Sequence, residues 1–126
     1  MVIPIFVHKA LLGDNIPVFG DGSQRRSFTY VEDVVSGVIK LMEVKDAIGE
    51  VVNIGNSNEI TISDLAELVI KVSNSKSKIE YIPYEKAYGV GFEDMSRRKP
   101  DISKIKKLIN FKPTLGIEEI VKKVVN

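Results

Sequence analysis

The sequence predicts a small mixed α/β domain built from short strands and four to five helices. Helices are indicated where apolar residues recur every three to four positions, which is the period of a buried helix face. Strands are indicated where short β-branched runs are bounded by glycine, asparagine or serine turns. The length of 126 residues allows one domain, and 44% hydrophobic with 28% charged residues is typical of a globular protein.

Composition excludes several classes of function. The chain has no cysteine and one histidine, which excludes disulfides, thiolate metal sites and histidine-rich metal sites. Its net charge of +1 gives no general attraction to nucleic acid or to acidic membranes. No apolar run approaches the roughly 20 residues of a membrane span, and residues 1–5 lack the basic segment and cleavage site of a signal peptide. We therefore expect a cytoplasmic protein without metal, nucleic-acid or membrane partners.

The first predicted helix covers residues 1–12. Pro4 suits the first turn of a helix, where a backbone N–H has no intrahelical partner in any case. The predicted inner face consists of Ile3, Phe6, Val7, Ala10 and Leu11. Domains usually begin with polar, expendable residues, so this apolar start predicts that the chain begins inside a larger fold.

A glycine-rich turn follows the first predicted strand. Residues 18–19 predict the strand, residues 20–22 (Gly-Asp-Gly) a tight turn, and residues 27–30 a return strand. Glycine adopts positive φ without strain, so we expect the two strands to fold back on each other as a hairpin. The return strand leads into a helix over residues 31–43. Its predicted buried face is Val31, Val34, Val35, Val38, Ile39 and Met42.

A second strand and helix follow in the middle of the chain. Residues 50–54 (EVVNI) form a β-branched run that predicts a buried strand. Thr61 and Asp64 have the spacing of a helix N-cap and a first-turn acid. The helix that they open is predicted to bury Ile62, Leu65, Ala66, Val69 and Val72. Residues 79–82 predict one more strand.

The connection over residues 83–100 shows no clear period and is longer than most, which is typical of functional or mobile loops. Asp101 can cap the next helix, whose predicted inner residues are Ile102, Ile105, Leu108 and Ile109. Asn110 suits the left-handed residue that ends a helix. The last predicted helix turns Ile117, Ile120, Val121, Val124 and Val125 inward.

Two basic clusters stand out, Arg25-Arg26 and Arg97-Arg98-Lys99. The planar fork of arginine matches pairs of phosphate oxygens and keeps its charge. If the fold brings the clusters together, they would clamp a diphosphate from two sides. The alternative is that both are solvated surface charges. Asp101, beside the second cluster, either orients an arginine or caps its helix.

No catalytic constellation is visible in the sequence. With His8 as the only histidine, a Ser-His-Asp triad is not supported. The two Gly-x-Gly pairs, at residues 20–22 and 89–91, lack the third glycine and the strand-to-helix context of a dinucleotide fingerprint. No tyrosine is followed four residues later by lysine. We therefore predict no catalytic residues in this chain.

Four pieces of the sequence, in order, resemble the C-terminal part of extended short-chain dehydrogenase/reductase enzymes. These pieces are VIPIFVHKALLGD, PVFGDGSQRRSFTYVEDVVSGV, VVNIGNSNEITISDLAEL and GFEDMSRRKPDISKIKKLINFKPT. The family comprises NAD-dependent nucleotide-sugar epimerases, dehydratases and decarboxylases. The likeness covers nearly the whole chain, and the types it resembles most are UDP-glucose 4-epimerase and UDP-glucuronate decarboxylase. The implied fold is the C-terminal lobe of a Rossmann-type nucleotide-sugar enzyme.

The resemblance also implies substrate-binding residues. The matching positions are Ile3, Pro4, Pro17, Val18, Phe19, Arg26, Asn53, Arg98 and Asp101. By this resemblance, backbone groups of residues 17–19 hold the base, and residues 2–4 line the substrate pocket. Arg26 and Arg98 bind the diphosphate or ribose. The expected ligand is a UDP-sugar or a related nucleotide sugar.

Two further contacts follow from the resemblance. Asn53 would contact the nucleotide, and Asp101 would support the ribose or an arginine. Arg25 stands where the family often has threonine. Of the two arginines in the first cluster, Arg26 is therefore the one predicted to bind the diphosphate or ribose.

The family's N-terminal NAD-binding domain has no counterpart in these 126 residues. Its glycine-rich loop and its Tyr-x-x-x-Lys pair are both absent, so NAD is expected in the missing half and the chain is expected to be inactive alone. The sequence leaves three alternatives: half of an isomerase or lyase that needs a separate Rossmann-domain chain, a stand-alone UDP-sugar-binding module, or an inactive self-associating fragment. Because the surface facing the missing half would be exposed, we expect a homo-oligomer.

Overall fold

The computed structural model describes residues 1–90 and 94–126, and it divides the chain into two compact units. Unit 1 comprises residues 1–26, 60–98 and 118–126, and unit 2 comprises residues 27–59 and 99–117. Within the described residues there are six α-helices, one 3-10 helix and five short strands. The predicted α/β class with short strands is confirmed.

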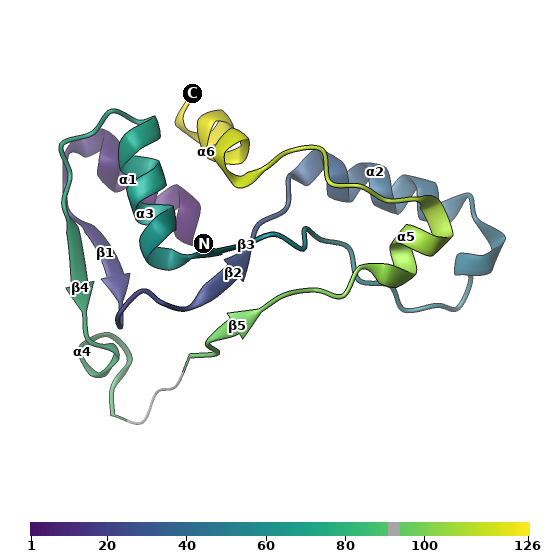
Figure 1. Cartoon of the computed structure of the whole chain (residues 1–126), viewed down its shortest axis with the longest axis horizontal. Coiled ribbons are helices and arrows are strands. Elements are labelled where there is room, and N and C mark those ends of the chain that lie inside the picture. Colours follow the sequence, from purple (N-terminus) through teal and green to yellow (C-terminus); the bar gives the residue numbers. More distant parts are fainter. Residues whose placement is uncertain (91–93) are drawn as a thin grey trace. The chain divides into compact units, whose positions relative to one another are not determined.

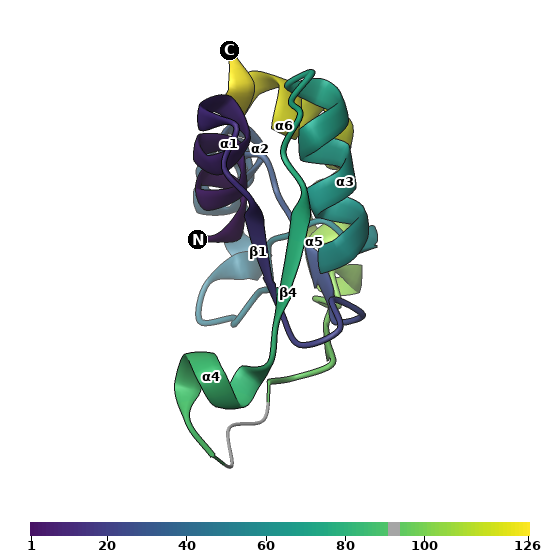
Figure 2. The ribbon, with the colours of Figure 1, turned by 90° about the vertical axis from the view of Figure 1, so that its left-hand side faces the viewer.

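The core of unit 1 lies between two parallel strands and two helices. Strand β1 (Ile16–Phe19) pairs in parallel with β4 (Ile79–Ile82). Helices α1 (Val2–Leu12) and α3 (Ile62–Val72) lie side by side against one face of these strands (Figures 1 and 2). The buried apolar residues of these elements are Ile3, Phe6, Val7, Ala10, Ile16, Val18, Ile62, Leu65, Ala66 and Val69. Leu11, predicted to point inward, is 59% exposed.

A separate three-stranded sheet has the order β3-β2-β5. Its strands are β2 (Arg25–Ser27), β3 (Glu59–Thr61) and β5 (Arg97–Arg98), and β2 pairs with β5 in parallel. The predicted hairpin is therefore wrong, since β1 and the strand after the turn belong to different sheets. The return strand also lies earlier than the predicted residues 27–30.

The physical reason lies in the turn between β1 and β2. Gly20 and Gly22 adopt the expected positive φ of 70° and 73°. The carbonyl oxygen of Gly22 accepts from the backbone N–H of Ser63 at 3.0 Å, and a Cβ at Gly22 would overlap the Ser63 side chain. The turn thus supplies acceptors to the first N–H groups of α3 instead of closing a hairpin.

Unit 2 is organised around α2 (Val31–Met42), the 3-10 helix η1 (Lys45–Ala47) and α5 (Ser103–Ile109). Its core consists of Ile102, Ile105 and Phe111, with Leu41, Val52, Ile54 and Ile109 packed against them. The predicted bounds of α2 are correct, but its predicted buried face is wrong. Five of the six residues of that face are exposed, namely Val31, Val35, Val38, Ile39 and Met42.

A different row of α2 faces the core of unit 2. Asp33 and Gly37 are buried, and Leu41 packs on the core one turn further along. Gly37 is needed there because an added Cβ would lie 3.1 Å from the Phe111 ring. Thr114 satisfies the Asp33 carboxylate through its backbone N–H at 3.0 Å and its hydroxyl at 2.6 Å. A buried polar anchor therefore overrides the apolar stripe in setting the orientation of α2.

The strand predicted at residues 50–54 is not formed. A strand needs a neighbour to receive its backbone hydrogen bonds, and the described residues supply none to this segment. Val52 and Ile54 instead pack on the core of unit 2, while Val51 is 86% exposed.

Several local predictions are confirmed. The Thr61 hydroxyl accepts from the Asp64 N–H at 3.0 Å and caps α3. Asn110 ends α5 in the left-handed conformation, with φ 50°. The last helix, α6 (Ile117–Val125), buries Ile120 and Val121 but leaves Val124 43% exposed.

The predicted long connection contains a short helix that periodicity did not reveal, α4 (Tyr84–Tyr88). Residues 91–93 of this connection, including one glycine of the second Gly-x-Gly pair, lie outside the described residues. No helix in the described ranges 1–90 and 94–126 is long and apolar enough to cross a membrane.

Candidate functional site

The two basic clusters lie on adjacent strands of unit 1. Strands β2 and β5 lie side by side (Figure 1). Their parallel register places Arg25 opposite Arg97 and Arg26 opposite Arg98. Successive side chains of a strand point to opposite faces, so Arg26 and Arg98 share one face of the pair. Neighbouring strands are about 4.8 Å apart, and like charges directly opposite each other repel. This arrangement favours an anion that bridges two arginines.

Arg26 is held in place by hydrogen bonds to three groups. Its Nη1 donates to the carbonyl oxygens of Arg25 and Met95, each at 2.8 Å. Its Nη2 donates to the carboxylate of Asp94 at 2.6 Å. The side chains of Arg26 and Asp94 are only 17% and 25% exposed, whereas Arg98 is exposed. The guanidinium of Arg26 is therefore fixed in place before any ligand arrives.

Tyr84, at the start of α4, completes this cluster. Its hydroxyl lies 3.5 Å from the same Asp94 carboxylate oxygen, and its ring occupies the space that a Cβ at Gly20 would need. Partial burial, followed by the nearby Asp94 charge, raises the pKa of the Tyr84 phenol above its ordinary value of 10.0. Strand β2, helix α4 and the turn after β1 thus meet at one place in unit 1.

Strand β1 carries the segment predicted to hold the base. Its N–H and C=O groups alternate between two sides. The Ile16 N–H donates to the carbonyl oxygen of Lys78, just before β4, and the Gly20 N–H donates to that of Ile82 in β4. The backbone groups of Pro17 and Phe19 therefore point away from β4. The Phe19 carbonyl accepts from the side-chain amide of Gln24 at 3.1 Å. Val18 is fully buried, so its side chain belongs to the core.

Asn53 and Asp101 come together in unit 2. The Asn53 side-chain amide donates to the Asp101 carbonyl oxygen at 3.4 Å. The Asp101 carboxylate accepts from the Ser103 backbone N–H at 2.9 Å and from the Ser103 hydroxyl. These bonds, the hydroxyl first, lower the pKa of Asp101 below its ordinary value of 3.8. Asp101 thus binds the first residue of α5, although the N-cap position of that helix is Ile102 and makes no side-chain cap.

Ile3 and Pro4, predicted to line the substrate pocket, lie in the first turn of α1. Ile3 is only 7% exposed and packs in the core of unit 1, whereas Pro4 is exposed. A pocket-lining role for the Ile3 side chain would require that core to open.

Sequence reasoning missed Asp94 and Tyr84. Both come from the aperiodic connection, and their partner Arg26 is 68 residues from Asp94 in the chain. No local spacing could reveal that contact, which needs the parallel pairing of β2 with β5. Among residues 1–90 and 94–126, no group of acidic or histidine side chains could hold a metal ion.

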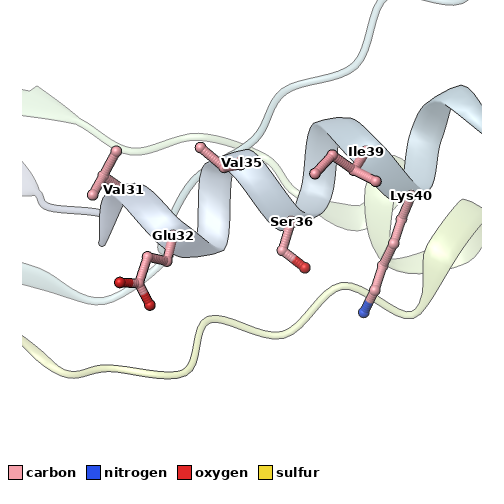
Figure 3. A pocket seen from close by; sticks show the side chains of 6 residues that line it. All are labelled: Val31, Glu32, Val35, Ser36, Ile39 and Lys40. Carbon is pink, nitrogen blue, oxygen red and sulfur yellow. The ribbon is translucent and has the colours of Figure 1, made fainter.

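Unit 2 carries a shallow hollow of about 350 Å³ along the exposed side of α2. Figure 3 shows two rows of side chains, with Val31, Val35 and Ile39 in one and Glu32, Ser36 and Lys40 in the other. The first row is apolar and the second is polar. All six residues belong to α2 alone, so the hollow is an open surface of the helix.

Comparison with known proteins identifies relatives in both sequence and fold. The family model of GDP-mannose 4,6-dehydratase matches residues 1–124. UDP-N-acetyl-α-D-glucosaminuronate decarboxylase of Bacillus cytotoxicus is 42% identical over 124 residues, which are 98% of this chain and 38% of the relative. The structure of UDP-glucose 4-epimerase of Thermotoga maritima with UDP-glucose has a TM-score of 0.86 at 30% identity. The match covers 99% of this chain and 38% of that one.

The chain belongs to this family, the NAD-dependent nucleotide-sugar epimerases, dehydratases and decarboxylases of the extended short-chain dehydrogenase/reductase type. It spans less than two-fifths of the length of these two relatives. UDP-glucuronate 4-epimerase of Thermodesulfobacterium geofontis is 38% identical to this chain over 112 residues. These residues make up 88% of this chain and 32% of that relative.

The glycine-rich turn after β1 does not fit an NAD site. A dinucleotide pyrophosphate binds where a glycine-rich turn leads from a strand into the N-terminus of a helix. Here the glycine turn after β1 leads into strand β2, and the N–H groups at the start of α3 already donate to the carbonyl oxygens of that turn. We therefore assign no cofactor chemistry to these residues.

Proposed function

We propose that this chain binds the diphosphate of a nucleotide sugar, most simply a UDP-sugar, as the substrate-binding part of a UDP-glucose 4-epimerase-like enzyme. The observation that carries the proposal is the pairing of Arg26 with Arg98 on adjacent strands. A diphosphate presents two neighbouring anionic groups, and two arginines one strand apart match that spacing. UDP-sugars are favoured because the relatives named above are enzymes of UDP-sugars.

The family resemblance implies further contacts of this chain with the nucleotide. Backbone groups of Pro17 and Phe19, turned away from β4, would hydrogen-bond the base. The same resemblance assigns polar contacts with the nucleotide to Asn53 and Asp101. These roles rest on the family resemblance.

The residues of this chain would bind and orient the substrate, without performing the redox step. In this family NAD supplies the hydride chemistry, and it would be held by polypeptide outside these 126 residues. A cytoplasmic location belongs to the same proposal because a chain without cysteine suits a reducing compartment.

Calorimetric titration of the purified chain with UDP tests the proposal. Arg26→Ala and Arg98→Ala should each weaken binding about 10- to 100-fold, since each removes a charge-assisted contact of about 1.5–3 kcal/mol. Arg25→Ala is the matched control, because it removes the same charge from the same strand on the opposite face. It should change the affinity less than threefold. Equal losses in all three variants would reduce the site to general electrostatic attraction.

A second candidate role is supported by the exposed side of α2. An exposed apolar row beside a hollow is typical of an association surface. Either a separate Rossmann-domain chain or a second copy of this chain could cover it. UDP affinity without self-association would favour the binding module, whereas concentration-dependent oligomers without UDP affinity would favour the inactive fragment.

A further inference from the structure

Arg26, the arginine most central to the proposed site, is already paired with a carboxylate. Asp94 accepts from Nη2 at 2.6 Å, and both side chains are more than 70% buried. Partial burial strengthens such a pair because less water screens it than at an exposed surface. The contact therefore differs from the exposed pairs of unit 1, such as Lys9 with Asp14, whose side chains are 39% and 50% exposed.

The pairing leaves Arg26 with few N–H groups for a ligand. A guanidinium has five N–H donors. Both donors of Nη1 point to carbonyl oxygens, and one donor of Nη2 points to Asp94. The two remaining N–H groups, one on Nη2 and one on Nε, lie on the same side of the guanidinium. A phosphate bound there would share Nη2 with the Asp94 carboxylate, and the two anions repel each other unless Asp94 moves away.

Asp94 is itself supported by its surroundings. The Tyr84 hydroxyl lies 3.5 Å from the same oxygen that accepts from Arg26. The Tyr84 ring is fixed against the turn at Gly20, where no larger residue would fit. Asp94 is thus held at Arg26 by a second side chain that has no part in the proposed phosphate contacts.

We propose that Asp94 is a built-in competitor for the phosphate site, whose carboxylate occupies Arg26 until a diphosphate displaces it. This inference rests on the proposed function and adds its regulation. Because the anion must first replace Asp94, the apparent dissociation constant is the intrinsic one divided by the fraction of Arg26 that is released. An anion that contacts only Arg26 binds too weakly to displace the Asp94 carboxylate. A diphosphate also contacts Arg98, and this second contact allows it to displace Asp94.

The competitor role predicts a gain of affinity when the carboxylate is removed. Asp94→Asn keeps a carbonyl oxygen for Arg26 but loses the charge, so it should bind UDP about tenfold more tightly than the unchanged chain. Inorganic pyrophosphate should gain by the same factor, since both ligands make the same exchange. Glu85→Gln, which removes an exposed carboxylate from α4, is the matched control and should change either affinity less than twofold.

The outcomes separate this inference from the proposed function. If the unchanged chain binds UDP and Asp94→Asn binds it equally or more weakly, Asp94 only positions Arg26 and the competitor role is overturned, while the proposed function stands. If neither protein binds UDP or pyrophosphate, both are overturned. Tyr84→Phe is a second variant, which removes the hydroxyl beside Asp94 and should tighten binding two- to threefold. An unchanged affinity in that variant counts against the support assigned to Tyr84.

Discussion

Tyr84 is the residue that reports most directly on the charge balance around Arg26. Its phenol is partly buried beside the Asp94 carboxylate, and both effects disfavour the phenolate and raise its pKa, while Arg26 acts in the opposite direction. The folded pKa therefore lies above the ordinary value of 10.0. The resulting contribution to stability is complete below about pH 10 and is lost as the pH rises through the folded pKa.

The expected result is a late tyrosine titration. The difference in phenolate absorbance between the unchanged chain and Tyr84→Phe should show one group titrating above pH 10. Asp94→Asn should move that titration downward, because the second cause of the shift is removed while Arg26 remains. If Asp94→Asn leaves the titration pH of the Tyr84 phenol unchanged, the contact between Tyr84 and Asp94 is contradicted.

At the residue scale, sequence reasoning succeeded where the physics is local. The Thr61 cap and the left-handed Asn110 both depend on neighbours within four residues, and both are confirmed. Ligand binding by Arg26 and Arg98 stays a prediction, but their pairing on adjacent strands is observed. The contact with Asp94 could not be predicted, because it needs a strand pairing between residues some seventy positions apart.

At the scale of elements, α2 shows how one buried polar residue sets the orientation of a helix. Asp33 is 4% exposed and accepts two hydrogen bonds from Thr114, in the segment that follows α5. Burying a carboxylate is unfavourable unless hydrogen bonds replace its water. These bonds therefore hold the row of Asp33, Gly37 and Leu41 toward the core of unit 2.

Asp33→Ala should lower the free energy of unfolding by about 2–3 kcal/mol, because it leaves the Thr114 N–H and hydroxyl without their acceptor. Asp33→Asn should cost less, since its carbonyl oxygen can still accept one of the two bonds. Urea unfolding followed by circular dichroism measures both. Glu32→Gln, one position away and exposed, is the control and should change stability by less than about 0.5 kcal/mol. Equal effects at both positions would contradict the anchoring role of Asp33.

The same helix explains why part of the fold could not be predicted. Periodicity identifies an apolar face but does not say what covers it. In α2 the stripe is real, yet the core contacts come from the row beside it. The run at residues 50–54 likewise has strand composition, but no described strand lies beside it. Both errors arise where the sequence is suited to contacts that the described residues of each unit do not make.

At the scale of the molecule, the exposed apolar residues of unit 2 are the main consequence of this mismatch. Val31, Val35 and Ile39 are 64%, 52% and 54% exposed and form one continuous row beside the hollow on α2 (Figure 3). Burial of apolar surface contributes about 25 cal/mol per Å². An exposed apolar row of this kind therefore favours association with another apolar surface. In a purified sample, that surface belongs to a second copy of the chain.

We therefore expect the purified chain to self-associate through α2. Light scattering should give a mass near 14.0 kDa at low concentration and a rising mass as the concentration increases. The double variant Val35→Lys with Ile39→Glu should stay at the monomer mass, since both substitutions place charges in the apolar row. Val124→Lys, which alters an exposed apolar residue of α6, is the control and should associate like the unchanged chain. A constant monomer mass for the unchanged chain at high concentration would show that the row on α2 is too small to hold two copies together, and a separate partner chain would then be the occupant to seek.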